Sequence, residues 1–131
     1  MAFATPLRRR NRRCIVVDAE KRTIEEMDIK GVNESLTPFY EVIGCDIVEF
    51  VTIDRGITMV IDECCKLKDF SGGFKFFGVD DLVITGRAVF LGMNNKGKFT
   101  ALKEHIKTFH FIIDWVKKED VPEPEFKIYS W

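Results

Sequence analysis

The chain contains no apolar run that approaches the roughly 18 residues a membrane-spanning helix requires. Arginines occupy the positions near the N-terminus where the apolar part of a signal peptide would lie. We therefore expect no membrane segment and a cytoplasmic location.

Cysteine and histidine are too few and too poorly spaced to indicate a metal site. The cysteines are Cys14, Cys45, Cys64 and Cys65. They form no CxxC pair and no Cys/His ligand spacing, so buried thiols in a reducing compartment are the simplest interpretation. His105 and His110 would point about 140° apart on a helix, which prevents them from sharing one ion. We expect no metal and no cofactor.

Acidic residues are absent from positions 1–13, where five arginines gather in the stretch RRRNRR. The remainder of the chain has more acidic than basic residues, and such a body repels nucleic acid at long range. The stretch is expected to be a solvated, unstructured arm, with contact to nucleic acid, contact to an acidic membrane or a short transit peptide as the alternatives. The arginines concerned are Arg8, Arg9, Arg10, Arg12 and Arg13.

Phenylalanine, with 12 copies, is the residue present in excess, and the apolar pattern predicts several strands. β-branched or alternating apolar residues favour strands at 14–18, 23–29, 46–53, 56–62 and 82–93, the last bent at its glycine. The turn between the third and fourth strands suits a hairpin with glycine in the left-handed conformation.

Two helices are expected. Thr37-Pro38 suits a helix start and Gly44 a helix end. From Thr100 onwards, apolar residues recur at spacings of four and three, which predicts an amphipathic helix over 101–117. The recurring residues are Leu102, Ile106, Phe109, Ile113 and Val116.

A second apolar stripe, formed by Phe111 and Trp115, would lie on the solvent-exposed side of that helix. The tail FKIYSW follows an extended linker and could fold back on this stripe or reach another copy of the chain. We therefore expect a homo-oligomer or a partner interface. Its residues would be Phe111, Trp115, Phe126, Tyr129 and Trp131.

These elements predict an α+β fold, in which a mainly antiparallel sheet is covered by one short helix and one C-terminal amphipathic helix. The expected organisation is a basic arm over 1–13, one domain over 14–119, and an aromatic tail over 120–131.

The stretch FSGGFKFFG, residues 70–78, allows three interpretations. Its phenylalanines fill the core, or glycine hinges make it a flap that stacks on a base while lysines meet phosphate, or it forms a contact patch for a partner protein. It has neither the GxGxxG nor the Walker pattern. Arg87 interrupts an apolar strand and lies either at a sheet edge or in a site. The candidate ligand-binding residues are Lys66, Lys68, Gly72, Gly73, Lys75, Phe76, Phe77 and Arg87.

Four stretches carry a resemblance to a known family: CIVVDAEKRTIEEMDI, LTPFYEVIGCDIVEFVTI, GITMVIDECCKLKDF and ITGRAVFLGMNNKGKFTAL. Over residues of about 14–103 they resemble the domain of unknown function 3846, which occurs in phages, plasmids and their bacterial hosts. Cys45 stands where the family commonly has glycine, and Cys64-Cys65 replaces a common acid-glycine turn. The resemblance implies no catalytic residue.

The resemblance implies an accessory protein of a phage or mobile element, acting in the bacterial cytoplasm, and such proteins often counter host defence. No nucleophile, base and oxyanion donor assemble in the sequence, so we expect no enzyme. The leading hypothesis is a binder that sequesters a small phosphorylated or nucleotide ligand. The alternatives are a module that inhibits a host protein and a nucleic-acid accessory protein.

Overall fold

The structure is a computed structural model that describes residues 11–54, 56–63, 70–76 and 79–122. Several predicted site residues lie outside these ranges. They are Arg8, Arg9, Arg10, Lys66, Lys68, Phe77, Phe126, Tyr129 and Trp131.

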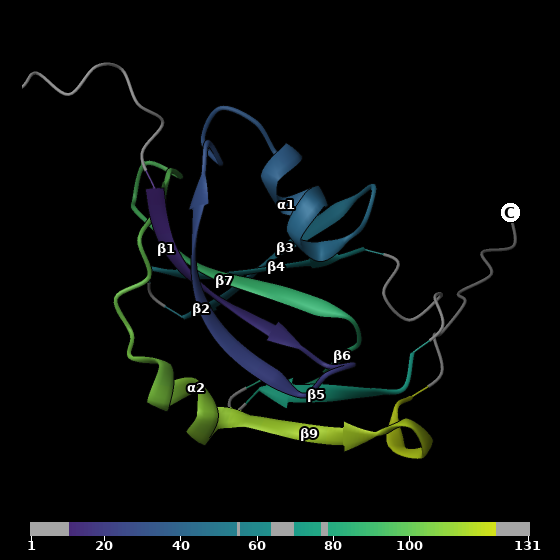
Figure 1. Ribbon diagram of the computed structural model, residues 1–131. Coiled ribbons are helices and arrows are strands. Elements are labelled where there is room, and N and C mark those ends of the chain that lie inside the picture. Colours follow the sequence, from purple (N-terminus) through teal and green to yellow (C-terminus); the bar gives the residue numbers. More distant parts are fainter. Residues whose placement is uncertain (1–10, 55, 64–69, 77–78, 123–131) are drawn as a thin grey trace, which may run out of the picture.

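The chain forms two antiparallel sheets, which confirms the predicted α+β class (Figure 1). The large sheet has the strand order β2-β1-β7-β4-β3, with β8 paired to one end of β7. Its strands are β1 (Asn11–Asp18), β2 (Thr23–Lys30), β3 (Val48–Asp54), β4 (Ile57–Asp62), β7 (Arg87–Met93) and β8 (Phe99–Thr100). The small sheet has the order β6-β5-β9, from β6 (Val79–Ile84), β5 (Gly72–Phe76) and β9 (Ile113–Lys117).

Helix α1 (Thr37–Ile43) and the small sheet cover opposite faces of the large sheet (Figure 1). Ile15, Val17 and Phe90 face the small sheet, whereas Cys14 and Val89 face α1. Strands β4 and β7 are therefore apolar at consecutive positions because both of their faces are covered.

The predicted first hairpin, the β3–β4 hairpin and α1 are all confirmed. Gly56 and Gly44 have φ values of 73° and 77°, which only glycine adopts without strain. The predicted strand over 82–93 is two strands, because Gly86, with φ of 76°, separates β6 in the small sheet from β7 in the large one.

The predicted helix over 101–117 is wrong in its extent. Helix α2 covers only Ile106–Ile112, and Ile113–Lys117 is strand β9, paired with β5. His105, not Thr100, caps α2, because its Nδ1 accepts a hydrogen bond from the Lys107 N–H at 3.1 Å. A short 3₁₀ turn, η2 (Lys118–Asp120), follows, and the buried Val121 extends the packed domain slightly beyond the predicted boundary at 119.

Candidate functional site

A cavity of about 250 Å³ opens on the α1 side of the large sheet. Alternation along β1 and β2 directs Val16, Asp18 and Glu25 to the face that also carries Cys14 and Ile29. Arg87 begins β7 directly opposite Asp18. The residues around the cavity are Val16, Asp18, Lys21, Thr23, Glu25, Met27, Val42 and Arg87.

Asp18 organises this cavity. Its Oδ1 accepts hydrogen bonds from the N–H groups of Glu20 at 2.9 Å and Lys21 at 3.2 Å, which shapes the β1–β2 turn. Its Oδ2 accepts from Arg87 Nε at 3.1 Å. The carboxylate is nearly buried, whereas the Arg87 side chain is 43% exposed. One buried anion thus holds a cation that still faces solvent.

Helix α1 gives Arg87 its second anchor. Arg87 Nη1 donates to the carbonyl oxygen of Val42 at 3.0 Å, in the last turn of the helix, where carbonyl groups favour a positive charge. The guanidinium is therefore held between β1 and α1, and its other N–H groups have no partner among the described residues. A planar group held in this way suits an oxyanion or carboxylate.

The rest of the cavity combines charge with apolar surface. Lys21 and Glu25 are exposed at its rim, and Thr23 adds a hydroxyl. Val16, Met27 and Val42 supply an apolar wall. The arrangement can bind a small molecule that has both an anionic group and an apolar ring. Within the described residues no group of His, Cys, Asp and Glu has a metal-binding arrangement.

Residues 72–76 form a strand and not the flap that one interpretation of residues 70–78 expected. Gly72, Gly73 and Phe76 belong to β5, the central strand of the small sheet, and all three are buried. The Phe76 ring stacks on Phe90 with ring centroids 5.3 Å apart. The interpretation that the phenylalanines fill the core is therefore correct for Phe74 and Phe76.

Lys75 and Arg87, both predicted to bind ligand, lie in different sheets. Lys75 is exposed between Val83 and Asp114, away from the residues around the cavity. Arg87 is not at a sheet edge either, since β7 is the central strand of the large sheet. Its acidic partner, Asp18, was missed because only the pairing of β1 with β7 reveals it.

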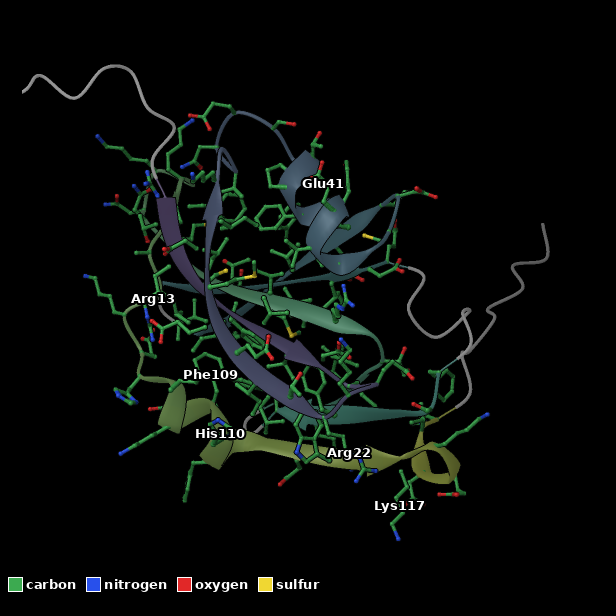
Figure 2. All side chains as sticks on the ribbon, in the orientation of Figure 1. Arg13, Arg22, Glu41, Phe109, His110 and Lys117 are labelled. Atoms are coloured by element: carbon green, nitrogen blue, oxygen red, sulfur yellow. The ribbon has the colours of Figure 1, made fainter. Side chains whose placement is uncertain are left out.

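Of the predicted interface residues, Phe111 is 88% exposed at the end of α2. Trp115 is on β9 and partly buried, in edge contact with Phe74 at a centroid distance of 6.3 Å. The two rings therefore do not form a stripe on one helix. Figure 2 shows Phe109, three residues from the end of α2, directed into the interior, where it contacts Phe90.

The predicted basic arm is shorter than 1–13, because β1 begins at Asn11. Arg12 Nε donates to the Phe99 carbonyl at 3.2 Å, and Arg13 Nη1 donates to the Leu102 carbonyl at 2.6 Å. Arg13 also pairs with Glu26. These two arginines tie β1 to the segment around β8.

Cys14 is fully buried under α1, and this burial raises the pKa of its thiol from 9.0 to about 12, with a smaller contribution from Asp28. We expect Cys14 to resist thiol reagents in the folded protein, because the thiolate is the reactive species. The measurement is mass-spectrometric mapping of labelled cysteines with and without denaturant. Labelling of Cys14 at the same rate in both conditions would contradict the prediction.

The same burial makes stability depend on pH. The unfolded chain loses the Cys14 proton above about pH 9, whereas the folded chain keeps it until about pH 12. This contribution to stability is full below pH 9 and declines as the pH rises through that window. A Cys14→Ala variant should lose less stability than the parent in urea titrations across this window. An equal loss of stability in the variant and the parent would argue against a contribution of the Cys14 thiol.

Taken together, the described residues define a small two-sheet α+β protein with a charged cavity between a helix and the first hairpin. A family model described as domain of unknown function (DUF3846) matches residues 12–113, and the chain belongs to this family. No curated protein and no solved structure shows significant similarity to the chain. Neither described helix has the length and apolarity needed to span a bilayer.

Proposed function

We propose that this protein is a non-enzymatic binder of a small anionic ligand of nucleotide type, held in the cavity around Arg87. The observation that carries the proposal is the guanidinium, positioned by Asp18 and the Val42 carbonyl and still open to solvent. A donor group that is already ordered loses little conformational entropy when the ligand binds.

The remaining residues of the cavity suit the other parts of such a ligand. Lys21 is placed for a second contact to phosphate, and Glu25 can accept from a sugar hydroxyl. The aliphatic wall of Val16 and Val42 suits one face of a base. The volume of about 250 Å³ lies just below the usual range of ligand pockets, which favours one small nucleotide over a large cofactor.

In the phage or mobile-element setting that the family resemblance implies, such a binder would act by sequestration. It would remove a signalling nucleotide of the host from solution without converting it. Sequestration requires affinity and abundance rather than turnover, and the Asp18 carboxylate is already engaged with backbone N–H groups and with Arg87.

The test is thermal unfolding of the full chain with a panel of mono-, di- and cyclic nucleotides and with inorganic phosphate. Binding to the folded state alone raises the melting temperature. We expect at least one nucleotide to stabilise the protein, and Arg87→Lys or Lys21→Ala to weaken its affinity by about tenfold, or about 1.4 kcal/mol. Lys75→Ala, exposed on the small sheet, is the matched control and should bind normally.

Two results would count against the proposal. The first is the absence of a stabilising shift across the panel. The second is a nucleotide affinity that Lys75→Ala reduces and Arg87→Lys does not. That result would mean that the nucleotide binds near β5 and not in the cavity around Arg87. Mass spectrometry should show that the bound nucleotide is chemically unchanged. Conversion of the nucleotide would refute the proposal that the protein is not an enzyme.

A second candidate function, a module that inhibits a host protein, is favoured by Phe111. A phenylalanine that is 88% exposed gains from burial against a partner. Affinity capture from host lysate should then yield a stable partner that Phe111→Ala loses and Lys107→Ala retains. Capture that is equal for both variants would exclude this surface.

A further inference from the structure

The strand order of the large sheet ends in two edge strands, β2 and β3. Within the described part of the chain, each pairs with a neighbour on one side only. An edge strand presents backbone N–H and C=O groups that can pair with another chain, and proteins usually protect such edges with charge, proline or bulges. The two edges differ in this protection.

Strand β2 is protected by charge. Glu25, Glu26 and Asp28 lie within four consecutive positions and are exposed. Every antiparallel register centred within residues 25–27 places two acidic side chains directly opposite each other. Like charges at opposite positions destabilise strand pairing, so β2 does not favour a second copy of itself.

Strand β3 carries only one charged residue, Glu49, over Val48–Thr52. Neither lysine nor proline occurs in the strand, and its register with β4 is regular until a bulge between Thr52 and Asp54. A twofold pairing centred on Phe50 places Glu49 opposite Val51 and Val48 opposite Thr52. Within Val48–Thr52 no like charges meet in this register, so this segment is self-complementary, whereas Asp46 and Asp54 come opposite each other just beyond it.

The directions of the backbone N–H and C=O groups of β3 agree with a pairing centred on Phe50. The Glu63 N–H donates to the Ile47 carbonyl at 3.1 Å, so Ile47 points its polar groups towards β4. Because these directions alternate along an antiparallel strand, Val48, Phe50 and Thr52 point theirs outwards. In the register centred on Phe50, these same residues oppose one another, as a hydrogen-bonded ladder requires.

The side chains add apolar surface at the same edge. Phe50 is 43% exposed and Ile47 is 54% exposed. The Phe50 ring lies against Phe39 and Phe99, with centroid distances of 6.1 Å and 5.8 Å, and is therefore held in place before any partner arrives. Cross-strand aromatic pairs are among those that stabilise sheets.

We propose that two copies of the chain associate through their β3 strands, antiparallel about Phe50, and so extend the large sheet across a twofold axis. This interface is distinct from the α2 surface predicted from the sequence, and it does not involve the Arg87 cavity. The contact is small, so association is expected to be reversible and to depend on concentration.

Sedimentation equilibrium of the full chain over a wide concentration range tests the proposal. We expect a monomer–dimer equilibrium that Phe50→Lys weakens by about tenfold or more, because two cations would face each other at the centre. Thr52→Pro is the second variant, since it removes an outward N–H without removing a bond to β4. Phe111→Lys is the matched control and should dimerise normally.

Hydrogen exchange gives a second readout. The amides of Val48, Phe50 and Thr52 should become protected as the concentration rises, whereas those of β2 should not. A monomer at all concentrations overturns the proposal, and is the result expected if segment 126–131 of the same chain covers β3. A dimer lost in Phe111→Lys but kept in Thr52→Pro also overturns it. Nucleotide binding should be unchanged in Thr52→Pro, which separates this test from that of the cavity.

Discussion

Replacing Phe74 with alanine is expected to lower the free energy of unfolding by about 3–5 kcal/mol. Phe74 is fully buried between the sheets and packs edge-on against Trp115. The strand around it is held by β6 and β9 on both sides, so the surrounding structure has little freedom to close the cavity that truncation leaves. The loss would be a large fraction of the 5–15 kcal/mol that typically stabilises a folded domain.

Phe111→Ala is the matched control for this prediction. The same substitution at a ring that is 88% exposed should change stability by no more than about 0.5 kcal/mol. Urea unfolding of both variants, followed by tryptophan fluorescence and by circular dichroism, measures the difference. Equal, small losses would mean that Phe74 belongs to a solvated flap and not to the core.

The second large effect is expected at Gly73, which the sequence indicated as a hinge. A Cβ atom at this position would lie 2.8 Å from the Ile84 carbonyl oxygen and 2.9 Å from Val83 Cγ1. The first contact is with backbone of a paired strand, which cannot move without breaking the small sheet. Gly73→Ala should cost about 1–3 kcal/mol, and Gly73→Val about 3 kcal/mol or more, through overpacking.

Lys75→Ala, two residues further along β5, is the control for Gly73. Its side chain is exposed and should tolerate truncation to within about 0.5 kcal/mol. Thermal melting of the three variants and the parent gives the comparison. If Gly73→Ala is as stable as the parent, β5 does not pack closely against Val83 and Ile84 of β6.

The apolar pattern over 101–117 shows that sequence periodicity alone does not determine secondary structure. Of its five apolar residues, Leu102, Phe109, Ile113 and Val116 are buried, so the pattern identified residues of the interior. The pattern did not identify the backbone conformation, because Ile113 and Val116 are buried as residues of a strand and not of a helix. The edge of β5 offers a complete ladder of partners to residues 113–117, and β-branched and aromatic side chains suit that conformation.

The candidate site was predictable only at Arg87, where a charge interrupts an apolar strand. Asp18 precedes it by 69 positions, and nothing local to either residue marks them as partners. The lysines and glycines of the 66–75 segment had the right chemistry for a phosphate site. Those glycines that are described, Gly72 and Gly73, serve close strand packing instead.

The sequence alone determined the local elements: the β1–β2 and β3–β4 hairpins, helix α1 with its glycine end, and the family to which the chain belongs. These depend on turn chemistry and on alternation between neighbours, which act over a few residues. The tertiary structure decided that residues 72–76 and 113–117 pair in a second sheet, and that Arg87 meets Asp18 and Val42. Those contacts satisfy backbone groups and charges across long separations, so only the folded chain selects them.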